Sequence, residues 1–215
     1  MEHFDPVPPD RFLAPLCRRY LLVLFKTLRA RMTDERGELA DLAVLWALGV
    51  LADGQYESAG AWAAPRLWEP AWPNVFYDLQ SRGVEHIRFV VSVNAGAFGS
   101  ALEGRYPNAS GVVLGSEVSN FSGLPANQWR AFSASQNAMR RLQCQASRSI
   151  GRHGAFSSSI HASSFVTEVL ASALKRLSTV DASREIGSTR AFATGRRVRR
   201  PGAQSAPLQS QLLAT

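Results

Sequence analysis

The chain has 215 residues, of which 46% are hydrophobic, and a formal net charge of +7. This length is sufficient for one domain with a full hydrophobic core and leaves room for an appendage. The longest apolar stretch, 39–52, contains Asp41 and is shorter than the roughly 18 uncharged residues of a membrane-spanning helix. The first residues, MEHFDPVPPDRF, are acidic and proline-rich and do not resemble a signal peptide. We therefore expect a cytoplasmic protein with no membrane partner.

Two cysteines, Cys17 and Cys144, are far apart in the sequence and do not form a metal-type pair. In a reducing cytosol such cysteines are typically free thiols. We expect both to be buried and reduced, in preference to a disulfide or a metal site.

The positive charge is unevenly distributed along the chain. Residues 184–215 hold six arginines and one acid, Glu185, so this tail has a net charge of +5 and the other 183 residues have +2. Arginines neutralise phosphates and release counterions, which gives affinity for nucleic acid without sequence preference. The composition thus predicts DNA as a partner, contacted by Arg196, Arg197, Arg199 and Arg200. A solvated tail without a partner fits the same composition.

Three consecutive strands are predicted in the first third. A continuous apolar run opens 19–31, and 42–51 is rich in Val, Leu and Trp, as expected of buried strands. Residues 34–37 form a polar turn between them. Asp53-Gly54 supports a tight hairpin turn, after which 56–63 returns as a third strand. These strands are expected to form an antiparallel meander.

The hydrophobic period then changes from strand to helix. Trp72, Val75, Phe76 and Leu79 are spaced as one helical face, and Gly83 is placed to cap the helix. An apolar strand is predicted at 87–93.

A short helix at 98–106 and a strand at 111–114 follow. A strand–helix–strand crossover requires parallel strands. The sequence therefore predicts an α/β fold whose mixed sheet combines the meander with parallel strands and is covered by helices, as in an RNase H-like core.

The second half is predicted to be helical and then disordered. Apolar stripes indicate helices at 126–150 and 163–177, with His153-Gly154 as the end of the first. From Asp181 onward Ser, Ala, Arg, Gly and Gln dominate, and we expect disorder. The predicted organisation comprises an N-terminal extension at 1–18, the RNase H-like core at 19–120, a helical region at 121–180 and a basic low-complexity tail at 181–215.

Short motifs in residues 20–110 occur in the order and spacing of the catalytic region of mutator-type transposases of bacterial insertion sequences, which the chain resembles. The matching elements are Tyr20-Leu21-Leu22-Val23, Arg31, Ala47-Leu48-Gly49-Val50, Asp53-Gly54, Gly60-Ala61-Trp62, Leu79-Gln80-Ser81-Arg82-Gly83-Val84, Val90-Val91-Ser92 and Tyr106-Pro107. The resemblance covers about two-fifths of the chain and implies an RNase H-like fold.

The resemblance also implies a catalytic site that this chain lacks. Members of the family use Asp, Asp and Glu to hold two divalent metals such as Mg²⁺, which activate the attacking oxygen and stabilise the leaving oxygen in DNA strand transfer. Leu24 stands at the first Asp position and Val93 at the second. A loose match of 186–193 to the segment of the third carboxylate places Ala193 there. We therefore expect no catalytic residues, no metal ligands and no metal cofactor.

Other polar residues are predicted to be structural. The family's Cys and His positions near the fifth strand hold Leu114 and Glu117. Acids such as Asp34, Asp53 and Glu117 are interpreted as loop charges. Asn94 alone cannot replace two carboxylates, and the histidines lack ligand-like spacing.

Several functions fit these observations. The first hypothesis is a transposase-family protein concerned with DNA transposition and recombination, present as a catalytically inactive, truncated and degenerate fragment. The alternative is a non-enzymatic protein that binds DNA or joins the oligomer of an intact transposase and regulates it. A relic reading frame without a function also fits.

Overall fold

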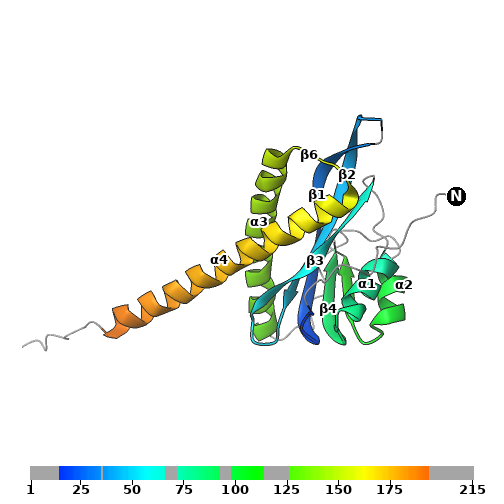
Figure 1. Ribbon diagram of the computed structural model, residues 1–215. Helices are drawn as coiled ribbons and strands as arrows, with labels where there is room; N and C mark the ends of the chain where they lie inside the picture. Colours follow the sequence, from blue (N-terminus) through cyan, green and yellow to red (C-terminus); the bar gives the residue numbers. More distant parts are fainter. Residues whose placement is uncertain (1–14, 35, 66–71, 93–97, 114–125, 194–215) are drawn as a thin grey trace, which may run out of the picture. The chain divides into compact units, whose positions relative to one another are not determined.

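The structure, a computed structural model, describes residues 15–34, 36–65, 72–92, 98–113 and 126–193 (Figure 1). The chain divides into two compact units, Met1–Ser178 and Thr179–Thr215. The first unit holds the sheet and the helices that cover it. In the part of the chain that the structure describes, no helix has the length and apolar character needed to cross a membrane.

An antiparallel meander forms the first half of the sheet. Its strands are β1 (Arg19–Thr33), β2 (Leu39–Val50) and β3 (Tyr56–Pro65). The carboxylate of Asp34 accepts hydrogen bonds from two backbone N–H groups and closes the first turn. At the second turn Asp53 accepts from the N–H of Gln55 at 2.9 Å, and Gly54 has φ of 86°. Both predicted turns are therefore built by an aspartate that binds the backbone.

Two parallel strands complete the sheet. Helix α1 (Trp72–Ser81) leads into β4 (His86–Ser92), and α2 (Phe98–Arg105) leads into β5 (Ser110–Val113). The strand order is β3-β2-β1-β4-β5, with β1 parallel to β4 and β4 parallel to β5. This is the mixed sheet of an RNase H-like core, and the fold prediction is confirmed.

Two further helices follow the sheet. Helix α3 (Ala126–His153) ends before Gly154, whose φ of 85° turns the chain into β6 (Ala155–Phe156). Strand β6 pairs in parallel with the distal end of β1, beside Arg31 and Met32. Helix α4 (Ser159–Ala193) starts where the hydroxyl of Ser158 accepts from the N–H of His161 at 3.1 Å, which is a side-chain N-cap.

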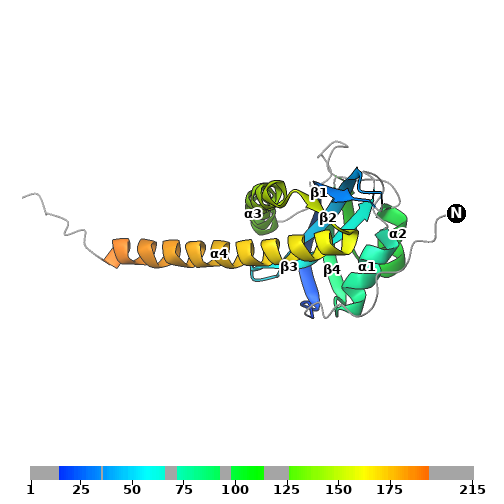
Figure 2. The same cartoon turned by 45° about the horizontal axis from the view of Figure 1, so that its top comes forward.

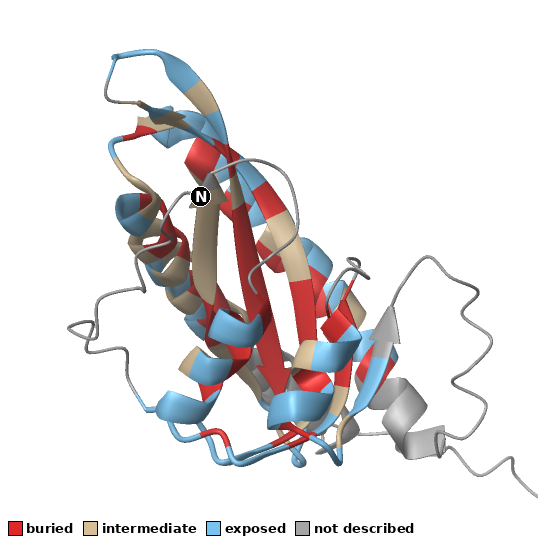
Figure 3. Ribbon diagram, turned by 90° about the vertical axis from the view of Figure 1, so that its right-hand side faces the viewer, coloured by how far each residue is buried: buried red, intermediate tan, exposed pale blue. Residues whose placement is uncertain are grey.

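Both faces of the sheet are covered by helices. Helices α1 and α2 lie on one side and α3 and the first half of α4 on the other (Figure 2). Buried residues concentrate in the central strands, whereas the turn between β1 and β2 is exposed (Figure 3). Below, the two sides are called the α1–α2 face and the α3–α4 face.

Alternation in the strands assigns side chains to the two faces. In β2 the even-numbered residues pack on the α3–α4 face, and the odd-numbered Leu45 and Ala47 pack on the α1–α2 face. The α3–α4 face is largely aliphatic, and its core includes Leu22, Leu24, Leu28, Leu42, Val44, Leu48, Val91, Met139, Leu142, Ile150, Val166 and Leu170. Each face thus has its own hydrophobic core.

Two expectations are wrong. The sequence predicts disorder from Asp181, but α4 continues to Ala193. Residues 181–193 contain no proline and include three alanines and two arginines, which favour helix. Both cysteines are exposed, not buried. Cys144 lies two residues from Leu142 and two from Ala146, and a separation of two residues points a helical side chain to the opposite side.

Candidate functional site

The resemblance to the family points to Leu24, which lies within β1 (Arg19–Thr33) and not at its end. In the sheet Leu24 lies between Leu48 of β2 and Val91 of β4. These three side chains are 2%, 0% and 1% exposed and belong to the core of the α3–α4 face. The position is therefore closed to solvent by the two helices and lined by hydrocarbon.

The second family position lies on the neighbouring strand. Val91 is the parallel partner of Leu24, and Val93 follows it by two residues. The parallel register therefore sets Leu24, in the middle of β1, beside the last residues of β4, which ends at Ser92. Val93 itself lies outside the described residues, as do Asn94, Leu114, Ser116 and Glu117.

The residues present do not fit a divalent metal site. Mg²⁺ is held by carboxylates and other oxygen ligands. Leu24, Leu48 and Val91 offer no oxygen from their side chains. Within the described ranges, no three residues among His, Cys, Asp and Glu are placed to hold a metal ion.

The remaining predicted positions belong to the C-terminal part of the sequence. Arg196, Arg197, Arg199 and Arg200 lie outside the described residues, so the DNA-binding prediction for them stays a prediction. Ala193 is the last residue of α4.

Asp34 and Asp53 are occupied with the backbone of their own turns. These two acids therefore have a structural role, as predicted for loop charges.

His153 and His161 lie together at the end of α3. The ring of His153 stacks on Phe156 with centroids 4.2 Å apart, and it meets His161 edge-on at 5.2 Å. His153 is the last residue of α3, so the interpretation of His153-Gly154 as a helix end is confirmed.

The motif glycine Gly49 has a packing role beside Tyr20. The ring of Tyr20 lies across Gly49, so that a Cβ there would be 2.7 Å from Tyr20 Cδ1 and closer still to Cε1. The Tyr20 hydroxyl donates to the carboxylate of Glu57 on β3. Burial raises the pKa of Tyr20, and the hydrogen bond to Glu57 raises it further. Glycine at this position lets the tyrosine bridge β1, β2 and β3.

A second set of motif residues joins β3 to α1. Gly60 has a φ of 139° at an irregularity in the pairing of β2 with β3. The guanidinium of Arg82 donates to the carbonyl of Ala59 at 2.6 Å and lies 3.4 Å from Asp78. The indole N–H of Trp62 donates to the same carboxylate at 3.1 Å. The Gly-x-Trp and Leu-x-x-Arg elements therefore stabilise one junction of the scaffold.

One polar contact of α3 was not singled out from the sequence. Gln143 accepts from the indole N–H of Trp46 at 2.6 Å and donates to the carbonyl of Thr27 at 3.0 Å. It fixes α3 on the sheet at a half-buried position. The sequence shows only that Gln143 follows Leu142 of the apolar stripe, and this does not reveal that Trp46 and Thr27 are its partners.

Comparisons with known proteins found one family and two curated relatives. Residues 13–112 match the sequence model of the family described as "Transposase, Mutator family". A probable transposase for an ISRM3-like insertion sequence element from Sinorhizobium fredii (strain NBRC 101917 / NGR234) is 36% identical over 93 residues. The transposase of insertion sequence element ISRM3 from Rhizobium meliloti (strain 1021) is 34% identical over 93 residues. Each match covers 43% of this chain and 23% of the relative.

A solved structure is also similar. The catalytic core domain of BIV integrase aligns with 71% of this chain and 80% of its own length, at 14% identity and a TM-score of 0.34. The fold assignment follows from the strand order and register given above.

Proposed function

Residues 13–112 belong to the mutator-type transposase family of bacterial insertion sequences, and on this premise we propose that the chain is a DNA-binding protein of the transposase kind that does not cut DNA with metal ions. The chain spans about a quarter of the length of the curated relatives it matches. The proposal therefore concerns this chain and not a whole transposase.

The packing of Leu24 carries this proposal. Two carboxylates on adjacent strands, as the family has, repel each other unless a metal is bound, and burying their charge is costly. Leucine at 24 instead extends the aliphatic core between Leu48 and Val91. The body can then fold without the ion that the family's carboxylates hold.

DNA binding is supported by charge. The tail from residue 184 has a net charge of +5, and neutralisation of phosphates gives salt-dependent affinity for DNA of any sequence. Regulation of an intact transposase by shared assembly stays a prediction, as does a relic reading frame.

The test combines cleavage and binding by the full chain. Purified protein is incubated with supercoiled plasmid in Mg²⁺, in Mn²⁺ and in a chelator, beside a mutator-type transposase with intact carboxylates. We expect equal nicking with and without metal, and binding of labelled duplex that weakens steeply with salt. Metal-dependent nicking by this chain would contradict the first half of the proposal. Absence of binding at low salt would contradict the second.

A further inference from the structure

The folded body has its own concentration of positive charge, separate from the tail. The family-matched segment 13–112 contains ten basic and ten acidic residues and is therefore neutral. Residues 126–177, which contain α3 and the first half of α4, hold seven basic residues and one acid, Glu168. The net charge of +6 on these helices is larger than that of the arginine tail.

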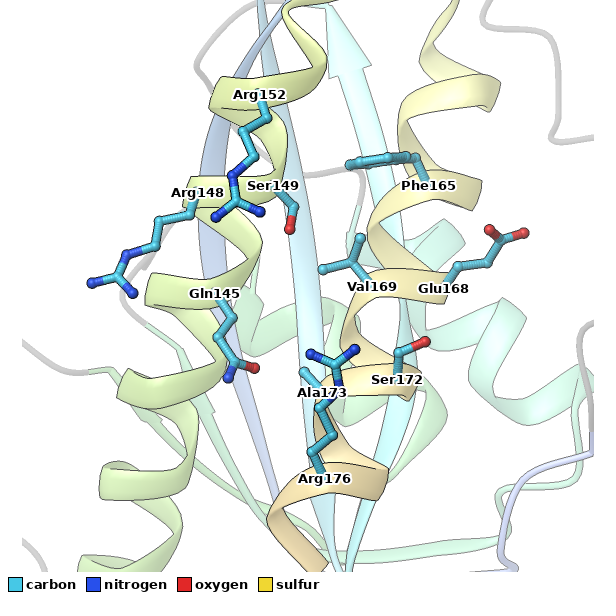
Figure 4. A pocket seen from close by; sticks show the side chains of 10 residues that line it. All are labelled: Gln145, Arg148, Ser149, Arg152, Phe165, Glu168, Val169, Ser172, Ala173 and Arg176. Atoms are coloured by element: carbon cyan, nitrogen blue, oxygen red, sulfur yellow. The ribbon is translucent and has the colours of Figure 1, made fainter.

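Part of this charge surrounds a groove between the two helices. The groove has a volume of about 440 Å³ and is lined by residues that include Arg148 and Arg152 of α3 and Arg176 of α4 (Figure 4). All three arginines are exposed. In Figure 4 Arg176 extends between the helices, whereas the Arg148 and Glu168 side chains extend outward, each away from the opposite helix.

These arginines are available to an external anion. The ion pairs of the described residues join Arg18 to Glu85 and Arg82 to Asp78. The three groove arginines thus have no carboxylate partner in the part of the chain that the structure describes. Three cations near one groove that has a single acid, Glu168, in its lining are not neutralised, and a bound anion relieves their repulsion.

The remaining lining also suits a phosphate chain. Gln145, Ser149 and Ser172 add amide and hydroxyl donors, and such side chains contact DNA phosphates together with arginine. The planar guanidinium matches two phosphate oxygens at once, which a lysine does not. Phe165 packs against His153 and Phe156, so the end of the groove is held rigid by rings.

We propose that the groove between α3 and α4 binds the phosphodiester backbone of nucleic acid through Arg148, Arg152 and Arg176. This inference rests on the proposed DNA-binding function and locates it on the folded body. It differs from the tail prediction because the arginines are held in place by two helices packed on the sheet.

The test compares matched triple substitutions in the full chain. The groove variant is Arg148→Gln with Arg152→Gln and Arg176→Gln. The control variant, Arg19→Gln with Arg29→Gln and Arg36→Gln, removes the same charge from exposed residues on β1 and the following turn. A third variant changes the four tail arginines to glutamine. Binding of labelled single-stranded and duplex DNA is measured by anisotropy across a NaCl series, and circular dichroism checks the fold.

We expect the groove variant to bind at least about tenfold more weakly than the control variant. Its slope of log K against log salt should fall by about 2 to 3, because each phosphate contact contributes roughly 0.9. Equal binding by the groove and control variants overturns the inference, and a loss in the tail variant alone leaves the proposed function standing. Failure of the unchanged chain to bind either DNA overturns both.

A substitution that removes a negative charge distinguishes a change in DNA affinity from a loss of folding. Glu168→Gln removes the one acid among the groove's ten described lining residues. We expect tighter binding, by about two- to fivefold at low salt, since one repulsive charge near phosphate is lost. Unfolding cannot produce a gain in affinity. Unchanged or weaker binding by this variant counts against the groove.

Discussion

The face of the sheet under α1 and α2 is packed by aromatic rings, whereas the face under α3 and α4 is packed mainly by aliphatic side chains. On the first, Phe25 meets Trp72 edge-on at 5.1 Å, and Trp72 meets Phe98 at 4.9 Å. On the second, Leu24 and Val91 pack with residues of α3 and α4, which lie beyond the matched segment 13–112. The position that matches the family's first carboxylate therefore lies in the aliphatic core and not in the aromatic one.

Two of the motifs that match the family have structural partners in or beside the sheet. Gly49 accommodates Tyr20, and Arg82 joins Asp78 and the carbonyl of Ala59. The family's carboxylates have a metal as their partner instead. Replacing one by leucine removes a ligand and adds buried hydrocarbon worth about 2 kcal/mol. A family scaffold can therefore persist after its catalytic positions have changed.

The largest expected effect comes from restoring a carboxylate at the α3–α4 face. Leu24→Asp places a charge among aliphatic side chains without a partner, and we expect a loss of about 3–5 kcal/mol in the free energy of unfolding. Urea denaturation measures it. Arg29→Asp, on an exposed position of the same strand, should change stability by less than about 0.5 kcal/mol.

Metal adds a second readout to the same variant. Because Leu48 and Val91 supply no oxygen, Mg²⁺ should leave the urea midpoint of Leu24→Asp unchanged. A bound ion at a hundred times its dissociation constant would add about 2.7 kcal/mol. An increase of that size in the free energy of unfolding would show that metal ligands remain near Leu24. The α3–α4 face would then not be a purely aliphatic core at this position.

This contrast shows what the sequence could and could not predict. The meander and α1 were predicted because apolar runs and the spacing of Trp72, Phe76 and Leu79 are local signals. The apolar stripes of α3 and α4 predicted core packing but not which face they cover. The contact of Gln143 with Trp46 joins residues 97 apart, and no local pattern encodes it.

Of the two candidate sites, the position of Leu24 could be predicted from the sequence and the groove between α3 and α4 could not. Leu24 was found from motif order alone, and the structure adds that its surroundings are hydrocarbon. The groove was missed because Arg152 and Arg176 come from different helices and meet only through tertiary packing. The net charge of residues 1–183 taken together is only +2, and this sum hides the +6 of residues 126–177.

An intermediate effect is expected from Gly49→Ala, which tests the α1–α2 face. The added methyl group overlaps the buried ring of Tyr20, and overpacking of this kind costs about 1–3 kcal/mol. Thermal or urea unfolding measures the change. Gly99→Ala in α2 is the matched control, because a Cβ there meets nothing within 4 Å, and it should be neutral or slightly stabilising. Equal behaviour of the two variants would show that Tyr20 is not held against β2.

The smallest effect concerns the ionisation of Tyr20 on the same face. Burial and the bond to Glu57 raise the pKa of its phenol in the folded state above the usual value of about 10. The folded state then holds this proton more tightly than the unfolded state, so the contribution to stability is complete below about pH 10 and is lost as pH rises further. Tyr20→Phe should cost about 1 kcal/mol at neutral pH by removing the bond to Glu57.

Above about pH 10 the two proteins should converge, because the variant's phenyl ring has no proton to lose and stability in the unchanged chain falls more steeply. Burial also raises the pKa of Tyr106, whose hydroxyl donates to the carbonyl of Val84, so some alkaline loss remains in both. Tyr77→Phe, at an exposed tyrosine, controls for the loss of a phenol in general. Parallel pH profiles for the Tyr20→Phe variant and the unchanged chain would mean that the phenol ionises as freely in the folded state as in the unfolded one. The bridge from β1 to β3 would then not be formed in solution.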